Sequence, residues 1–197
     1  MKGILPLFFV ALFTYSSYSS SADSNGQFAL KGAARESFER YVQARTSKSQ
    51  DYLIYVGWIE GFITGFNQFQ RKNFDITPWQ TTELMSGLLE NHCKKAPKDG
   101  FFFAVSKMLK VVYSLRLQEE SRLSQVTSGD YSLFLYEKII FDMKSKLKAK
   151  NYLQGKVNSS FDEKTRQAIQ QYQKDNKIKE TGMPTTETLY HLFMLEN

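Results

Sequence analysis

The sequence predicts an all-α protein in which helical domains follow an export signal. Apolar residues recur at steps of three and four through most of the 197 residues, as they do on the buried face of a helix. The 42% hydrophobic and 15% aromatic content suffices for a packed core, and the length suits two small domains or one of ordinary size. We expect an N-terminal bundle of about four helices over 23–117, a polar linker over 118–130 and a three-helix domain over 131–197.

The first 22 residues have the layout of a secretory signal peptide. Lys2 precedes an apolar run from Ile4 to Phe13, and small residues follow at Ser20 and Ala22. A membrane-spanning helix needs about 20 apolar residues, so we expect cleavage after Ala22 rather than an uncleaved anchor. No cysteine lies near the cleavage point, which argues against a lipoprotein. The predicted location is the periplasm or another exported compartment.

The chain is basic, with a formal charge of +6 that falls to +5 when Lys2 leaves with the signal. In an exported protein this charge favours an anionic envelope over nucleic acid as the partner. No basic run is dense enough to predict a phosphate-binding surface. Four lysines cluster at a predicted helix end, where cations complement the helix dipole: Lys144, Lys146, Lys148 and Lys150.

The first helix is expected from Ala34 to Thr46, and the second from Asp51 to Phe69, with Ser49 as its cap. The second helix carries an aromatic stripe of Tyr55, Trp58, Phe62, Phe66 and Phe69, and a glycine stripe of Gly57, Gly61 and Gly65. Each glycine costs roughly 1 kcal/mol against alanine in a helix interior. We expect the close approach of a neighbouring helix to offset this cost; a ligand groove is the alternative. Glu60 at the centre argues against a membrane span.

Two further helices complete the predicted bundle. Thr77 caps the first of them, with Pro78 at its first position, and that helix runs to about Cys93. Asp99 begins the last helix, which runs to about Leu117.

The C-terminal domain is predicted to open with a helix whose apolar face contains Tyr136, Ile140, Met143 and Leu147. Asp162 and Glu163 place negative charge at the start of the next helix. One face of that helix carries Thr165, Ala168, Ile169 and Tyr172. Thr181-Gly182 supplies a turn, Pro184 suits the first turn of a last helix, and the apolar residues of that helix are Leu189, Leu192 and Phe193.

The last third of the chain resembles the peptidoglycan-binding-like domain, a small three-helix module of cell-wall hydrolases and other envelope proteins. The matching positions are Leu147, Gly155, Phe161, Thr165, Ala168, Tyr172-Gln173, Gly182 and Thr188-Leu189. Where the family has two Asp-Gly steps, this chain has Asn158-Ser159 and Thr181-Gly182. The resemblance implies peptidoglycan as the ligand.

A ligand groove is expected beside the loop from Asn158 to Phe161. Tyr152 and Tyr172 offer faces on which sugar rings can stack, and Asn158 and Thr165 offer hydrogen bonds. The alternative interpretation assigns Phe161, Thr165 and Tyr172 to the core or the caps of the fold, and periodicity favours it for Thr165 and Tyr172.

The N-terminal half is similar to a family of small exported helical domains that includes periplasmic acid-stress chaperones and immunity-like proteins. The similarity rests on Ala44-Arg45, the stretch from Trp58 to Asn67, the stretch from Leu89 to Cys93, Pro97 and Ala104. It implies a protein partner. The cysteine that the family places before Ala44-Arg45 is missing near Phe38, so the family's disulfide is expected to be absent.

Catalytic and metal chemistry find little support in the sequence. Cys93 is the one cysteine, and we interpret it as a buried thiol, with an intermolecular disulfide or a nucleophile as alternatives. Adjacent His92 points about 100° away from it on a helix, and His191 lies in the other predicted domain. Two histidines and one cysteine do not supply a typical zinc set.

Glu60 could act as the acid of a glycosidase, but only Asp51 and Asp75 suggest themselves as partner carboxylates.

We therefore predict an exported, non-catalytic cell-envelope protein whose C-terminal domain binds peptidoglycan and whose N-terminal bundle binds a protein partner. Two alternatives stay open: a peptidoglycan hydrolase with Glu60 as its acid, and a periplasmic chaperone or inhibitor. No cofactor, metal or nucleic acid is expected.

Overall fold

The computed structural model describes residues 22–93, 95–96, 98–129 and 131–195. The chain forms two compact units, residues 1–30 and residues 31–197. All of the predicted signal peptide except Ala22 lies outside the described residues. In the first unit, the Asp23 carboxylate accepts hydrogen bonds from the backbone N–H groups of Asn25 and Gln27, which closes a short turn.

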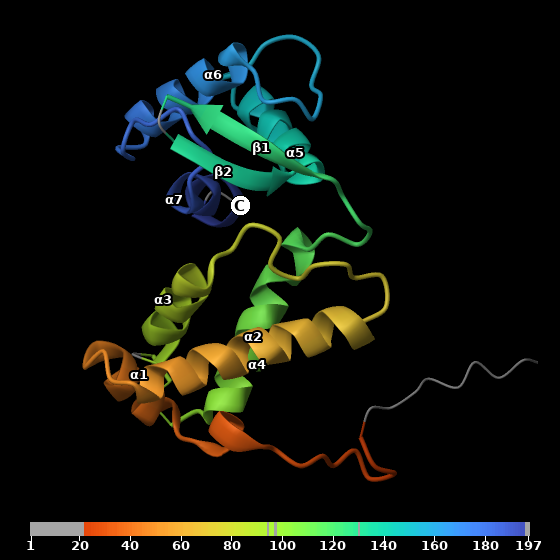
Figure 1. The fold of residues 1–197 in the computed structure, drawn as a ribbon, viewed down its shortest axis with the longest axis vertical. Coiled ribbons are helices and arrows are strands. Elements are labelled where there is room, and N and C mark those ends of the chain that lie inside the picture. The colour runs from red at the N-terminus through yellow and green to blue at the C-terminus, as the bar shows by residue number, and fades with distance from the viewer. Residues whose placement is uncertain (1–21, 94, 97, 130, 196–197) are drawn as a thin grey trace, which may run out of the picture. The chain divides into compact units, whose positions relative to one another are not determined.

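The second unit is mostly helical, so the predicted all-α class is confirmed in broad terms (Figure 1). Its first part contains the 3-10 turn η1 (Gly32–Arg35), α1 (Phe38–Thr46), α2 (Asp51–Phe69), α3 (Thr82–Cys93), α4 (Phe101–Val112) and the 3-10 turn η2 (Tyr113–Leu115). Its second part contains β1 (Leu123–Ser128), β2 (Tyr131–Tyr136), α5 (Glu137–Ala149), α6 (Glu163–Asp175), α7 (Thr186–Tyr190) and the π-helical turn η3 (His191–Leu195).

Several helix starts differ from the prediction. Asp162 caps α6 as expected, and its carboxylate accepts from the Thr165 N–H at 2.8 Å. Ser49 does not cap α2, because its hydroxyl donates backwards to the Ala44 carbonyl. The helix predicted to start at Thr77 begins at Thr82, where the Thr81 hydroxyl accepts from the Leu84 N–H. Local capping motifs alone do not select among neighbouring hydroxyl residues.

An antiparallel hairpin of β1 and β2 occupies much of the segment predicted to be a linker and the start of a helix. β1 is difficult to recognise in the sequence because Val126 is its one fully buried residue. Tyr136, expected on the first C-terminal helix, is the last residue of β2, and α5 begins at Glu137.

Two hydrophobic cores stabilise the second unit. One lies among α1, α2 and α4, where the fully buried rings of Phe38, Tyr41 and Phe101 stack and tilt against one another. The other lies among α5, α6, α7 and the hairpin, and it includes Trp79 and Leu117 from the predicted N-terminal bundle. Trp79 stacks on Phe193 with ring centroids 5.7 Å apart. Side chains from both sides of the predicted boundary between two domains thus share one core. The boundary itself stays a prediction.

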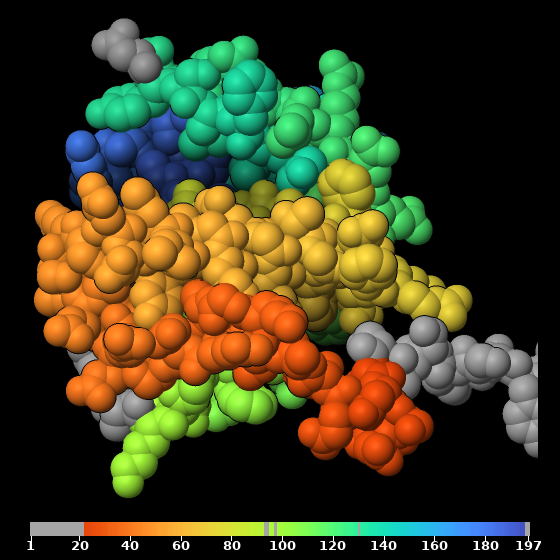
Figure 2. All heavy atoms as spheres, turned by 60° about the horizontal axis from the view of Figure 1, so that its bottom comes forward, coloured from red at the N-terminus to blue at the C-terminus, as the bar shows by residue number. Residues whose placement is uncertain are grey.

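The glycine stripe of α2 faces open space, so the predicted close approach of a neighbouring helix is wrong. At Gly57, Gly61 and Gly65, no described atom outside the helix lies within 4 Å of the position that a Cβ would occupy. Figure 2 shows α2, in orange to yellow, lying along the visible surface. Leu53 and Phe69 near its ends have exposed fractions of 67% and 79%. Only one side of α2 is in the core, through residues such as Tyr55 and Ile59.

Candidate functional site: a cleft beside the C-terminal helices

The loop between α5 and α6 is fixed by a buried lysine. The side chain of Lys144 follows Ile140 by four residues and precedes Leu147 by three, which places it on the apolar face of α5. It is 2% exposed, and its amine donates to the Asn158 side-chain oxygen and to the Ser160 carbonyl, both at 2.7 Å. The prediction of Lys144 as one of several dipole-complementing lysines is therefore wrong. Its role is to hold the loop against the helix.

A buried glutamine organises the connection from α6 to α7. The Gln173 side-chain oxygen accepts from the N–H groups of Thr181 and Gly182, each at 2.8 Å. Its amide nitrogen lies 2.9 Å from both the Met183 carbonyl and the Thr188 hydroxyl. Both ends of the amide are satisfied, which is the condition for burying it at little cost. The Tyr172-Gln173 pair of the sequence thus supplies the buried polar centre of the C-terminal helices.

Gly182 fits this connection for two reasons. Its φ of +66° lies in the left-handed region that glycine adopts without strain. A Cβ there would also lie 2.8 Å from the Arg166 Cγ. The expected turn at Thr181-Gly182 is therefore present, and it packs directly on α6.

The residues predicted to bind ligand fall into two groups. Thr165 and Tyr172 are 0% exposed, so their side chains belong to the core and do not reach a ligand in this structure. This corrects their assignment to the site for a simple reason: they share the buried face of α6 with Ala168 and Ile169. Tyr152 packs edge-on against Tyr172, 5.3 Å between centroids, and is half-buried.

Asn158 and Phe161 remain near the surface. Asn158 is exposed, although its side-chain oxygen is already bonded to Lys144 and to the Ser160 N–H. Phe161 is half-buried against the core. The structure therefore leaves Tyr152, Asn158 and Phe161 as the predicted residues that a ligand can reach.

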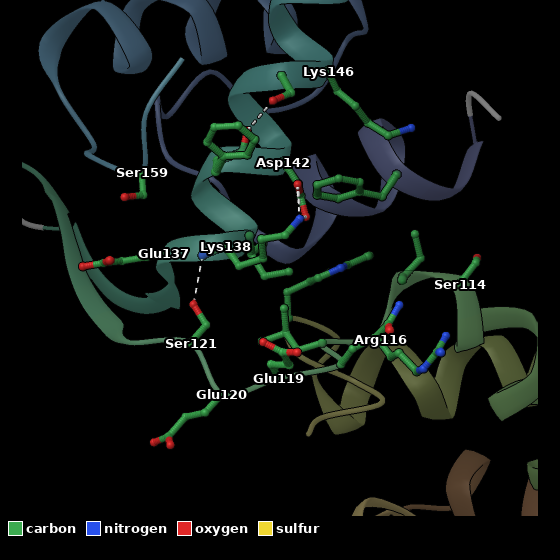
Figure 3. A pocket seen from close by; sticks show the side chains of 18 residues that line it. Ser114, Arg116, Glu119, Glu120, Ser121, Glu137, Lys138, Asp142, Lys146 and Ser159 are labelled. Carbon is green, nitrogen blue, oxygen red and sulfur yellow. Dashed lines mark hydrogen bonds and ion pairs between the residues drawn. The ribbon is translucent and has the colours of Figure 1, made fainter. Parts of the chain in front are cut away.

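A cleft of about 880 Å³ opens beside α5, and sequence reasoning did not identify it. One wall is the outward face of α5, with Lys138, Phe141, Asp142 and Ser145. The other wall comes from η2 and the following segment 116–121, and Figure 3 shows Arg116 and Ser114 across the opening from Lys138. Ser159 of the α5–α6 loop lines it too, so the cleft adjoins the loop that Lys144 fixes. Its volume is in the range of small-ligand sites.

The chemistry of the cleft is mixed rather than strongly basic. The charged side chains of its lining are Arg116, Glu119, Glu120, Glu137, Lys138, Asp142 and Lys146. Lys138 pairs with Asp142 one helical turn along α5, and the Arg116 guanidinium lies 3.8 Å from the centre of the Tyr113 ring. Phe141, 40% exposed, gives the cleft an apolar surface. Such a lining suits a polar ligand with both hydroxyl and charged groups.

The catalytic alternative gains no geometric support. Glu60 is an exposed residue whose carboxylate accepts from the Thr82 hydroxyl at 2.9 Å. Asp51, one of its suggested partners, lies nine residues earlier in the same helix, a rise of roughly 13 Å. Paired glycosidase carboxylates lie about 5–9.5 Å apart. Asp75 is occupied in a turn, where it accepts from the Thr77 N–H.

Cys93 ends α3, and its side chain lies outside what the structure describes. His92 contacts the Asp99 carboxylate at 3.0 Å. Within the described residues, no group of three or more histidine, cysteine, aspartate or glutamate side chains is arranged to hold a metal ion.

Comparison with known proteins finds a family-model match in the C-terminal part of the chain. Residues 138–192 match the model of the peptidoglycan binding domain family. The match starts in the first turn of α5 and ends in η3, so it includes both Lys144 and Gln173. It confirms the predicted resemblance for this region and supports peptidoglycan binding and an association with the cell envelope.

The remaining comparisons found no relatives. No curated protein matches the chain, and no solved structure matches it. The similarity suggested for the N-terminal half therefore has no support from them. Among the helices of the described residues, none is long and apolar enough to cross a membrane.

Proposed function

We propose that this is an exported, non-catalytic protein that attaches to peptidoglycan through its C-terminal helices. The observation that carries the proposal is the family match over residues 138–192. The built features of that region agree with it, because Lys144 and Gln173 hold both of its loops in defined positions. A rigid loop beside an open cleft is a suitable receptor for a rigid polymer.

The cleft of α5 is proposed as the attachment site. Peptidoglycan offers sugar hydroxyl and acetamido groups together with peptides that carry free carboxylates and amines. Ser145 and Ser159 provide hydroxyl groups toward the former, and the mixed charges of the lining suit the latter. Phe141 supplies the exposed ring against which a sugar or an apolar peptide side chain can pack. Tyr152, Asn158 and Phe161 extend this surface along the same domain.

For the N-terminal bundle we propose a protein-binding role on the exposed face of α2. Its three glycines leave a flat helix surface, and Leu53, Ile54 and Phe69 add exposed apolar area. Large exposed apolar side chains on one element are a common feature of interaction surfaces. Export through the signal at residues 1–22 completes the proposal.

Co-sedimentation with purified peptidoglycan sacculi tests the attachment role. The full mature chain is used, because Trp79 and Leu117 complete the C-terminal core. Wild type is expected to pellet at low and at moderate salt, whereas non-specific adsorption of a basic protein is screened by salt. Replacing Phe141 by serine is expected to weaken pelleting. Phe103→Ser, which changes an exposed ring on α4, is the matched control. Failure of wild type to pellet would remove the proposal.

The hydrolase alternative is tested on the same material. Wild type and Glu60→Gln are incubated with sacculi, and released soluble fragments are measured. We expect no release by either protein. Release by wild type that is lost in Glu60→Gln would establish the enzyme instead.

A further inference from the structure

The β1–β2 hairpin carries an outward face that the family match does not include, since that match begins at Lys138. Residues directly opposite one another on paired strands point to the same side of a sheet. The register pairs Leu123 with Tyr136, Gln125 with Phe134, and Thr127 with Ser132, and these pairs form one face. The other face contains Val126 and Leu135, which are buried in the core.

The outward face combines exposed aromatic and apolar surface with neutral hydrogen-bonding groups. Phe134 is 67% exposed and Leu123 is 53% exposed. Phe134 and Tyr136 are two residues apart on β2, about 7 Å along the strand. Phe74 continues the row, packing edge-on against Tyr136 at 5.9 Å between centroids. Phe134 is the most exposed of the three rings, and Tyr136 is partly buried against the core.

Polar groups that can contact a hydroxylated ligand lie beside these rings. Gln125, directly opposite Phe134, donates from its amide nitrogen to the Ser132 hydroxyl at 2.8 Å. Thr127 is exposed next to them. None of the six paired residues of the face carries a charged side chain, although 23% of the chain is charged. A surface of this kind fits a neutral ligand with apolar faces and polar edges.

We infer that this hairpin face binds the glycan backbone of peptidoglycan, as a second contact apart from the cleft of α5. The inference rests on the proposed function and deepens it. The glycan backbone is a chain of N-acetylated sugars that is neutral where its lactyl carboxyl groups are amide-linked to peptides. The C–H faces of these sugars stack on aromatic rings, and their hydroxyl and acetamido groups bond to amide and hydroxyl side chains. The charged groups of peptidoglycan are on its peptides, which an uncharged face does not select. The neutrality of the face is thus the feature that separates glycan from peptide.

The test uses the full mature protein and three probes: intact sacculi, oligomers of N-acetylglucosamine as a neutral glycan, and the peptides that an amidase releases from sacculi. We expect wild type to bind intact sacculi and the glycan oligomers. Phe134→Ala and Gln125→Ala are each expected to weaken binding to the glycan oligomers about tenfold, the effect of losing one well-packed interface contact. Phe103→Ala, which removes an exposed ring on α4, is expected to leave it unchanged.

The hairpin inference and the proposed function fail on different results. Binding to intact sacculi without binding to the glycan oligomers, or glycan binding unaffected by Phe134→Ala, overturns the hairpin inference and leaves the proposed function standing. No binding to intact sacculi overturns both.

Two further measurements cover other occupants of the face. Loss of a wild-type dimer in Phe134→Ala, seen by analytical ultracentrifugation together with no glycan binding, assigns the face to a second copy. Phe134-dependent binding to neutral lipid vesicles without glycan binding assigns it to a lipid surface.

Discussion

The side-chain nitrogen of Gln173 lies 2.9 Å from the hydroxyl of Thr188, and both side chains are completely buried. This contact joins the end of α6 to the first turns of α7. Thr188 is held from the other side by Thr185, whose hydroxyl lies 2.9 Å away and which caps α7. The two C-terminal helices are therefore connected through a polar centre inside an apolar core.

Replacing Gln173 by leucine should destabilise the protein by about 2–4 kcal/mol, because the N–H groups of half-buried Thr181 and buried Gly182 lose their acceptor and each orphaned group costs about 1–3 kcal/mol. Urea unfolding of the variant and wild type measures this change. Gln171→Leu, which alters an exposed position of the same helix, should change stability by less than about 0.5 kcal/mol. Equal stability of the two variants would show that the hydrogen bonds of Gln173 contribute little to the fold.

Gly182→Ala should destabilise by more than Gly129→Ala. Both glycines have positive φ, +66° and +56°, so both substitutions carry a similar backbone strain of about 1–2 kcal/mol. Only at Gly182 would the new Cβ meet Arg166, at 2.8 Å from its Cγ, whereas no described atom lies within 4 Å at Gly129. The difference between the two unfolding free energies isolates the cost of that contact. A difference of zero would mean that the Arg166 side chain moves away freely.

Alanine at Gly57 or Gly61 should stabilise the protein by about 0.5–1 kcal/mol. Alanine is the better helix former, and the space around both positions is open. Thermal unfolding of the two single variants provides the measurement. A loss of stability at either position would indicate that something packs on this stripe of α2, such as a second copy of the chain.

Stability should decrease at acidic pH partly through Asp162. Hydrogen bonds from the Thr165 hydroxyl and N–H, with the attraction of Lys144, hold the pKa of the Asp162 carboxyl below its ordinary value of 3.8. Because the pKa is lower in the folded chain, the carboxylate stabilises the fold above pH 3.8, and this contribution is lost as the pH falls toward the lowered pKa.

Asp162→Asn keeps the capping oxygen and removes the titration. Urea midpoints collected from neutral pH to below 3.8 should therefore decrease less steeply for Asp162→Asn than for wild type. Parallel curves for the two proteins would contradict a role of Asp162 in acid sensitivity.

The sequence predicted the elements with strong periodicity and missed those fixed by tertiary contacts. α2 has the expected bounds, Asp51 to Phe69, since long apolar periodicity defines a helix clearly. The hairpin was missed because β1 has one fully buried residue, Val126. Lys144 was misread because a lysine is rarely buried, although its position on the stripe of Ile140 and Leu147 was a usable signal.

The candidate site was predictable in part. Thr165 and Tyr172 follow the helical period and proved to be buried, in agreement with the alternative interpretation. The cleft beside α5 could not be derived from the sequence, because one of its walls comes from residues 114–121 and the other from a helix 20 or so positions later. Only the folded chain places Arg116 opposite Lys138.

The most direct test of the central claim is co-sedimentation of the full mature protein with purified sacculi at moderate salt. We expect the wild-type protein to pellet, Phe141→Ser to pellet less, and Phe103→Ser to pellet like wild type. A wild-type protein that stays in the supernatant at every salt concentration would contradict the claim that this chain attaches to peptidoglycan.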